Sequence, residues 1–155
     1  MTRFIFGLIM LALGLGPSAL ADHHADDDGG KPFVLIARLH SLAEQADAVL
    51  ALSQVADQKV YAGEPGMLLH TFDRNPDDRL SFVWTEVYAD SAALTFHLNN
   101  PDLIAYLDAV SPLLDSFTIE LYGTVSEAVV AELRATGTPV THYKTALGYI
   151  RDLTP

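Results

Sequence analysis

The sequence predicts an α+β domain of the ferredoxin-like, split βαβ type, in which helices cover one face of an antiparallel sheet. The apolar pattern alternates between strand and helix periods in the order β-α-β-β-α-β, and one more helix and strand follow. The strongest strand segment, 79–89 (RLSFVWTEVYA), is apolar on both faces, so helices on one face leave the other uncovered. A second copy of the chain would bury that face, which predicts a homodimer with the architecture of a dimeric α+β barrel.

The first strand and the helix after it are predicted from their apolar patterns. Residues 33–40 (FVLIARLH) form a nearly continuous apolar run, interrupted by Arg38 and His40, which favours a strand. Ser41 and Glu44 have the spacing of a capping box, so a helix is expected to begin there. The apolar stripe of this helix consists of Ala46, Val49, Ser53, Ala56 and Val60.

The next segments predict an antiparallel hairpin. Gly63 and Pro65 are expected to end the helix, and residues 66–74 (GMLLHTFDR) to form the second strand. Residues 75–78 (NPDD) favour a turn, and so short a link to the third strand implies antiparallel pairing. In that third strand one face is formed by Leu80, Phe82, Trp84 and Tyr88, and the other by Val83 and Val87.

The remaining elements are two helices, a strand and a C-terminal extension. Asp90 is expected to cap a short helix that ends at Leu98, and Asp102 to begin another. A fourth strand is expected over 116–123 (SFTIELYG). The extension, 124–155, is expected to contain a helix over 126–135 and an extended segment over 140–150, packed on the domain or on the dimer partner. In the helix that begins at Asp102, Leu103, Leu107, Val110 and Leu114 share one apolar face.

The N-terminal residues resemble a cleavable secretory signal peptide. Arg3 is followed by an uncharged apolar run over 4–15, which is too short to cross a bilayer, and residues 19–21 (ALA) offer a cleavage site. We therefore expect a signal peptide over 1–21, no membrane insertion after its removal, and a periplasmic or secreted protein. Residues 22–32 are expected to form a disordered leader ahead of the domain over 33–123.

This leader suggests a metal site that depends on cleavage after residue 21. The new N-terminus would begin Asp22-His23-His24. Its amine, two backbone nitrogens and the imidazole of His24 could surround Cu(II) in a square plane, with His23 as a further ligand. A flexible polar leader without a metal is the alternative.

Composition excludes several classes of protein. The 155 residues include no cysteine, which excludes disulfides and thiolate chemistry, and the formal net charge is −11. An acidic surface repels phosphate backbones, so nucleic-acid binding is not expected.

One stretch of sequence is similar to a known family. Residues 64–66 (EPG), followed by 82–90 (FVWTEVYAD), 92–94 (AAL) and His97, resemble the antibiotic biosynthesis monooxygenase family, which includes quinol monooxygenases. The resemblance covers roughly 33–122. It implies a dimeric α+β barrel and, in some members, oxidation of phenols or quinols by O2 without a cofactor.

The haem-degrading branch of this family matches the sequence less well. By an ungapped alignment, its asparagine on the first strand, its tryptophan on the short helix and its haem-ligating histidine fall at Ala37, His97 and Leu107. Leucine cannot ligate iron, so haem degradation is not expected.

The resemblance and the chemistry together suggest His97, Trp84, Tyr88 and His70 as site residues. A cofactor-independent oxygenase needs an apolar pocket, a base such as a neutral imidazole, and aromatic walls that stack on the substrate. Each of these residues could instead be part of the core. Glu86 is expected to form a structural ion pair or hydrogen bond, with Arg38 on the first strand as a candidate partner, and His40 is expected to be a solvated strand-end residue.

The sequence therefore leaves three functions open. The first is an exported, cofactor-independent monooxygenase that oxidises a quinol or phenol-type small molecule with O2. The second is a non-catalytic dimeric protein that binds a small molecule, with a stress-response role. The third is a periplasmic copper-binding protein that uses Asp22, His23 and His24.

Overall fold

The computed structural model describes residues 31–151. The predicted signal peptide, the copper ligands Asp22, His23 and His24, and nearly all of the predicted leader lie outside the described residues. Within them, the elements in chain order are β1 (Phe33–Ser41), α1 (Ala46–Gly63), β2 (Met67–Arg74), β3 (Ser81–Tyr88), α2 (Ser91–Leu98), α3 (Pro101–Val110), the 3₁₀ turn η1 (Ser111–Leu113), β4 (Leu114–Tyr122), α4 (Glu127–Ala135) and β5 (Val140–Tyr143).

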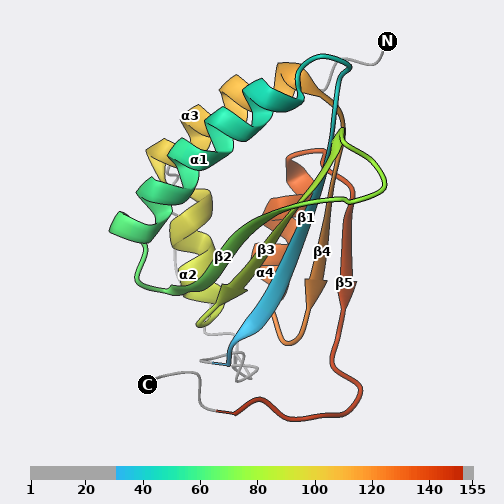
Figure 1. Cartoon of the computed structure of the whole chain (residues 1–155). Helices are drawn as coiled ribbons and strands as arrows, with labels where there is room; N and C mark the ends of the chain where they lie inside the picture. Colours follow the sequence, from blue (N-terminus) through green and yellow to red (C-terminus); the bar gives the residue numbers. More distant parts are fainter. Residues whose placement is uncertain (1–30, 152–155) are drawn as a thin grey trace.

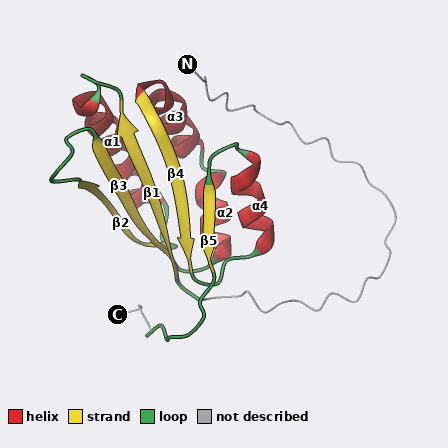
Figure 2. Ribbon diagram, turned by 90° about the vertical axis from the view of Figure 1, so that its right-hand side faces the viewer, coloured by secondary structure: helices red, strands yellow, loops and turns green. Residues whose placement is uncertain are grey.

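The predicted α+β, split βαβ fold is confirmed. The five strands form one sheet in the order β2-β3-β1-β4-β5, antiparallel except for the parallel pairing of β4 with β5. The helices lie on one face of this sheet, as Figures 1 and 2 show. β2 and β3 are neighbours in an antiparallel hairpin, as predicted.

The core lies between the helices and the covered face of the sheet. Burial alternates strictly along β1 and β3, as it must when side chains point alternately to the two faces of a strand. Phe82, Trp84, Glu86 and Tyr88 of β3 face the helices, whereas Val83 and Val87 lie half-buried on the opposite face. The predicted division of β3 into two faces is therefore confirmed.

The predicted capping box is wrong. Ser41 is fully buried and still belongs to the sheet, because its backbone N–H donates to Leu80 O at 2.8 Å. Helix α1 begins at Ala46 after Gln45, which makes no side-chain capping bond, and Glu44 has a φ of 68° in the turn before it. The pairing of Ser41 in the sheet therefore takes the place of the predicted helix cap. Three residues of the predicted stripe, Val49, Ser53 and Val60, are buried.

Other boundaries differ from the prediction by a few residues. Helix α3 begins at Pro101 with Asn100 as its cap and ends at Val110, so Leu114 belongs to β4 rather than to the helix. Pro112 lies in η1, where a proline cannot continue the hydrogen bonding of the helix. The last extended segment is shorter than predicted, since β5 ends at Tyr143.

The predicted pairing of Glu86 with Arg38 is also wrong. The two side chains lie on opposite faces of the sheet, because Glu86 is buried toward the helices and Arg38 is exposed. Arg38 instead forms an ion pair with Glu120 on β4, at 3.1 Å.

Candidate functional site

A cavity of about 100 Å³ lies between the covered face of the sheet and helices α1, α2 and α3. Four polar or aromatic side chains that the sequence suggested, His70, Trp84, Tyr88 and His97, all line this cavity. They come from β2, β3 and α2, so the fold brings together residues that the sequence analysis could only name one by one. Apolar residues of β1, α3 and β4 complete most of the wall, among them Leu35, Leu39, Leu107, Val110 and Ile119.

His97 is held by a buried ion pair. Asp90 caps α2 by accepting from the N–H of Ala93 at 2.8 Å, and the helix buries His97 on the side that faces the cavity. The Nδ1 atom of His97 lies 2.8 Å from Glu64 Oε2, and the second oxygen of Glu64 accepts from Asn100 Nδ2 at 2.7 Å. Both carboxylate oxygens of Glu64 are therefore engaged, which fixes the imidazole ring in place.

This pair shifts the pKa of both partners. Burial lowers the pKa of His97, but the hydrogen bond that His97 donates to Glu64 and the charges of Glu86 and Glu64 outweigh it, so the pKa is raised above 6.5. Burial raises the pKa of Glu64, but its bonds with His97 and Asn100 outweigh that effect and the pKa is lowered. The folded protein therefore favours Glu64 as a carboxylate and His97 as an imidazolium.

His70 has a second carboxylate partner. Its Nδ1 lies 2.9 Å from Asp57 Oδ1 on α1, and its ring stacks on Trp84 with centroids 4.1 Å apart. Because a carboxylate can only accept, Nδ1 of His70 is the donor to Asp57, and Nε2 is the ring nitrogen left for a ligand.

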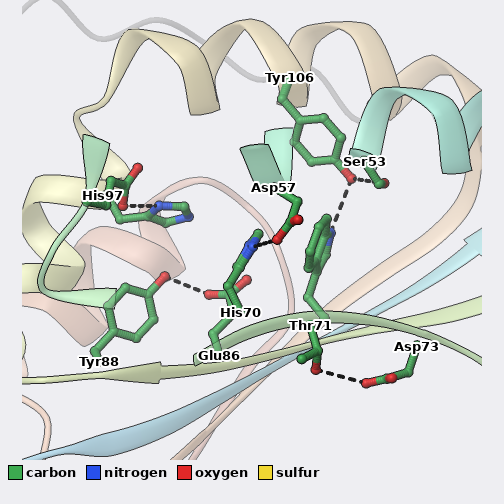
Figure 3. Close-up of polar contacts among 11 residues, drawn as sticks. Ser53, Asp57, His70, Thr71, Asp73, Glu86, Tyr88, His97 and Tyr106 are labelled. Atoms are coloured by element: carbon green, nitrogen blue, oxygen red, sulfur yellow. Dashed lines mark hydrogen bonds and ion pairs between the residues drawn. The ribbon is translucent and has the colours of Figure 1, made fainter. Parts of the chain in front are cut away.

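The two imidazoles face one another across the site. The ring centroids of His70 and His97 are 6.5 Å apart. Figure 3 shows both rings between the helix above and the strands below. Within residues 31–151 neither Nε2 atom has a hydrogen-bond partner in the protein. Each is therefore free to bind a small molecule in the cavity.

Trp84 is anchored through its indole N–H. Trp84 Nε1 donates to Tyr106 Oη at 3.2 Å, and that hydroxyl also shares a 2.9 Å hydrogen bond with Ser53 Oγ on α1. Figure 3 shows Tyr106 and Ser53 meeting above the sheet. The flat face of the indole thus has a fixed orientation in the cavity wall.

Glu86 and Tyr88 form a second buried polar pair. Tyr88 Oη donates to Glu86 Oε2 at 2.6 Å (Figure 3), and Glu86 is only 6% exposed. Burial, the charge of Glu86 and this hydrogen bond raise the pKa of Tyr88 well above its ordinary value. Tyr88 is therefore a neutral donor at any physiological pH.

Several residues of the site were missed in the sequence. Asp57, Glu64 and Tyr106 were not suggested as site residues, and Glu86 was assigned to a structural ion pair or hydrogen bond. Their partners are far apart in sequence: Glu64 and His97 are separated by 33 residues, and Ser53 and Tyr106 by 53. The one available signal was the Glu64-Pro65-Gly66 segment, which was used for the resemblance and not for chemistry.

Two further histidines of the described residues, His40 and His142, do not line the cavity. His40 lies between Asp78 at 3.2 Å and Asp115 at 3.4 Å, and His142 Nε2 contacts Gly123 O at 3.0 Å. Ala37 and Leu107, the positions aligned with the haem-degrading branch, do line the cavity, but their side chains carry no atom that binds iron. In the part of the chain that the structure describes, no three His, Asp or Glu side chains are grouped so as to hold a metal ion.

Comparison with known proteins identifies relatives of the same architecture. The profile of the family described as antibiotic biosynthesis monooxygenase matches residues 32–109. A proposed antibiotic biosynthesis monooxygenase from Caulobacter crescentus CB15 has a similar structure, with 24% identity and a TM-score of 0.58, over 64% of this chain and 95% of that one.

Two further structures support the same fold. MupZ from Pseudomonas fluorescens is 17% identical with a TM-score of 0.63, over 81% of this chain and 98% of that one. A proposed antibiotic biosynthesis monooxygenase from Nitrosomonas europaea is 18% identical with a TM-score of 0.57, over 60% of this chain and 89% of that one. No curated protein matches the sequence. Among residues 31–151, none of the helices has the length and apolarity needed to span a membrane.

Proposed function

Because this chain belongs to the antibiotic biosynthesis monooxygenase family, we propose that it is a cofactor-independent monooxygenase that oxidises a quinol or phenol-type small molecule with O2. The observation that carries the proposal is the cavity itself: two carboxylate-bound imidazoles present free Nε2 atoms to an apolar space with an aromatic wall. An electron-rich aromatic ring fits such a space, and its hydroxyl fits the imidazoles.

The proposed reaction needs a proton acceptor and a group that stabilises an anion. O2 reacts with the phenolate rather than with the neutral phenol, so the hydroxyl proton must leave first. In a phenol with a free ring position, one oxygen atom of O2 then becomes the second carbonyl of a quinone. The other oxygen leaves as water with the two hydrogens that the substrate loses.

The two imidazoles divide these tasks. His70 is the base, because Asp57 accepts from its Nδ1 and leaves Nε2 to take the hydroxyl proton. His97, whose pKa is raised by Glu64 and Glu86, is charged and stabilises the phenolate. The stacked face of Trp84 holds the ring, while the apolar residues of the wall keep water away from the reactive anion.

Oxygen consumption with a panel of reduced quinols and phenols tests this proposal. We expect turnover that falls by about 10²–10⁴ in kcat/KM in His70→Asn and His97→Asn, the range for loss of general acid–base catalysis. His142→Asn, on β5 and outside the cavity, is the matched control and should keep full activity. With ¹⁸O2, the product should carry one labelled oxygen. Ligand binding without oxygen consumption would instead assign the cavity to a non-catalytic binding protein.

We further propose that the protein acts outside the cytoplasm as a homodimer. Export is supported by the charged, apolar and small-residue segments at the N-terminus. Dimerisation is supported by the uncovered face of the sheet, on which Val34, Ile36, Val83 and Val87 form an apolar centre.

A further inference from the structure

Among the described residues, Glu86 is the carboxylate of the cavity that forms no ion pair of its own. Three carboxylates line the cavity: Glu64, Glu86 and Asp102. Glu64 is paired with His97 at 2.8 Å and Asp102 with Lys59 at 2.6 Å. Within residues 31–151, Glu86 forms no ion pair at contact distance, although its charge helps to raise the pKa of His97, and Tyr88 supplies its one hydrogen bond, to Oε2.

A buried carboxylate with an unused oxygen requires a donor. Glu86 is 6% exposed and lies on the face of β3 that points into the cavity. Oε1 has no hydrogen-bond donor within residues 31–151, so a hydroxyl that enters the cavity can donate to it, and a hydrogen bond to a charged acceptor is stronger than one between neutral groups. Figure 3 shows Glu86 beside His70 and Tyr88, on the strand side of the site and opposite Tyr106.

The size of the cavity restricts the ligand to one ring. An engineered protein cavity of about 150 Å³ holds one benzene molecule. The present cavity is smaller, about 100 Å³. A single six-membered ring is closest to this volume, and a second fused ring would require larger displacements of the side chains that line the cavity.

We propose that Glu86 selects the substrate: its carboxylate accepts a hydrogen bond from one hydroxyl of an uncharged, single-ring aromatic molecule and repels rings that carry a carboxylate of their own. The inference rests on the proposed function, which places the other hydroxyl of the ring at the two imidazoles. A site built to bind a hydroxyl strongly rejects an analogue that lacks it, because the buried acceptor is then left unpaired. Glu86 is thus a specificity-determining residue.

Binding can be measured apart from catalysis with the protein's own fluorophore. Trp84 is the chain's single tryptophan and lines the cavity, so ligand entry should quench its emission. Titrations are made without oxygen with four ligands: hydroquinone, 4-methoxyphenol, 4-hydroxybenzoate and 1,4-naphthohydroquinone. 4-Methoxyphenol lacks one donating hydroxyl, 4-hydroxybenzoate adds a charge, and the naphthohydroquinone adds a ring.

The expected result is a clear order of affinities. Hydroquinone should bind at least about tenfold more tightly than each of the other three, as expected for a hydrogen bond to a buried charge. In Glu86→Gln the preference for hydroquinone over 4-methoxyphenol should shrink by about tenfold. In the same variant 4-hydroxybenzoate should bind more tightly than it does to the wild type. Glu132→Gln, exposed on α4, is the matched control and should behave as the wild type.

Other outcomes would overturn the inference. Equal binding of hydroquinone and 4-methoxyphenol to the wild type, or an unchanged preference in a folded Glu86→Gln variant, would remove Glu86 from substrate selection. Naphthohydroquinone binding as tightly as hydroquinone would refute the single-ring limit. If the expected affinities are found but no oxygen is consumed, the proposed function fails while the inference about the ligand stands.

Discussion

At the scale of single residues, the pairing of Glu64 with His97 predicts a dependence of stability on pH. The raised pKa of His97 means that its stabilisation is complete below the ordinary value of 6.5 and is lost as the pH rises through the raised value. The lowered pKa of Glu64 means that its stabilisation is present above the ordinary value of 4.5 and is lost as the pH falls through the lowered value. The pair should therefore stabilise the protein most between about pH 4.5 and pH 6.5.

The variant Glu64→Gln tests this pH range of greatest stabilisation. We expect the variant to be less stable than the wild type by about 1–3 kcal/mol near pH 6, the range for a buried hydrogen bond to a charged group, and the difference to shrink toward pH 9. Urea unfolding at several pH values measures it. Glu127→Gln is the control, because its pair with Lys144 is on the surface and contributes little. A difference that grows with rising pH would contradict the assigned protonation states.

Tyr106 provides a second prediction at this scale. Tyr106→Phe removes the acceptor of the Trp84 N–H and the partner of Ser53, and leaves both groups unsatisfied in a buried setting. We expect a loss of stability of about 1–3 kcal/mol and a shifted emission maximum of Trp84 in the folded state. Phe at this position fills nearly the same volume, so a loss of stability without a spectral change would show that Trp84 does not depend on Tyr106.

At the scale of elements, the contact between the start of β2 and helix α2 positions His97. Gly66 lies so close to α2 that a Cβ there would be 2.6 Å from Ala93 Cβ. Gly66→Ala must therefore push β2 and α2 apart, with an expected loss of stability of about 1–3 kcal/mol and lower catalytic activity.

Gly63→Ala, three residues earlier, is the matched control: a Cβ there meets nothing within 4 Å. It should leave the stability unchanged or raise it slightly, because glycine is a poor helix former. Thermal unfolding and oxygen uptake of the two variants provide the comparison.

The elements also show what the sequence could and could not predict. Every strand and α-helix was predicted, because apolar period and turn residues are local signals and because the side chains of Asp90 and Ser126 cap the helices that follow them. The start of α1 was not predicted correctly, because Ser41 pairs with Leu80, 39 residues away, and therefore does not cap the helix. The same limit applies to the site: His97 was recognised from a pattern, whereas its partner Glu64 becomes visible only when α1 and α2 are packed.

At the scale of the whole molecule, the uncovered face of the sheet predicts the dimer. Helices cover one face, and the other exposes an apolar centre flanked by Leu69 at 40% and Tyr122 at 39% exposure. A monomer would leave this face in water, at a cost in free energy that grows with the apolar area of the face. The sheet of a second copy packed on it would bury the uncovered faces of both copies. We therefore expect a dimer at micromolar concentration in analytical ultracentrifugation.

Val83→Asp tests whether that face is the interface. Val83 lies half-buried on the uncovered side of β3, where a charge would have to be buried in the apolar contact between the two sheets. We expect this variant to sediment as a monomer with an intact fold by circular dichroism. Val55→Asp, the same change at a 52% exposed position of α1, is the matched control and should remain a dimer. A wild-type monomer, or a Val83→Asp variant that stays dimeric, would show that the sheets do not pack face to face. Oxygen uptake by the monomeric variant would then show whether the cavity works without a partner.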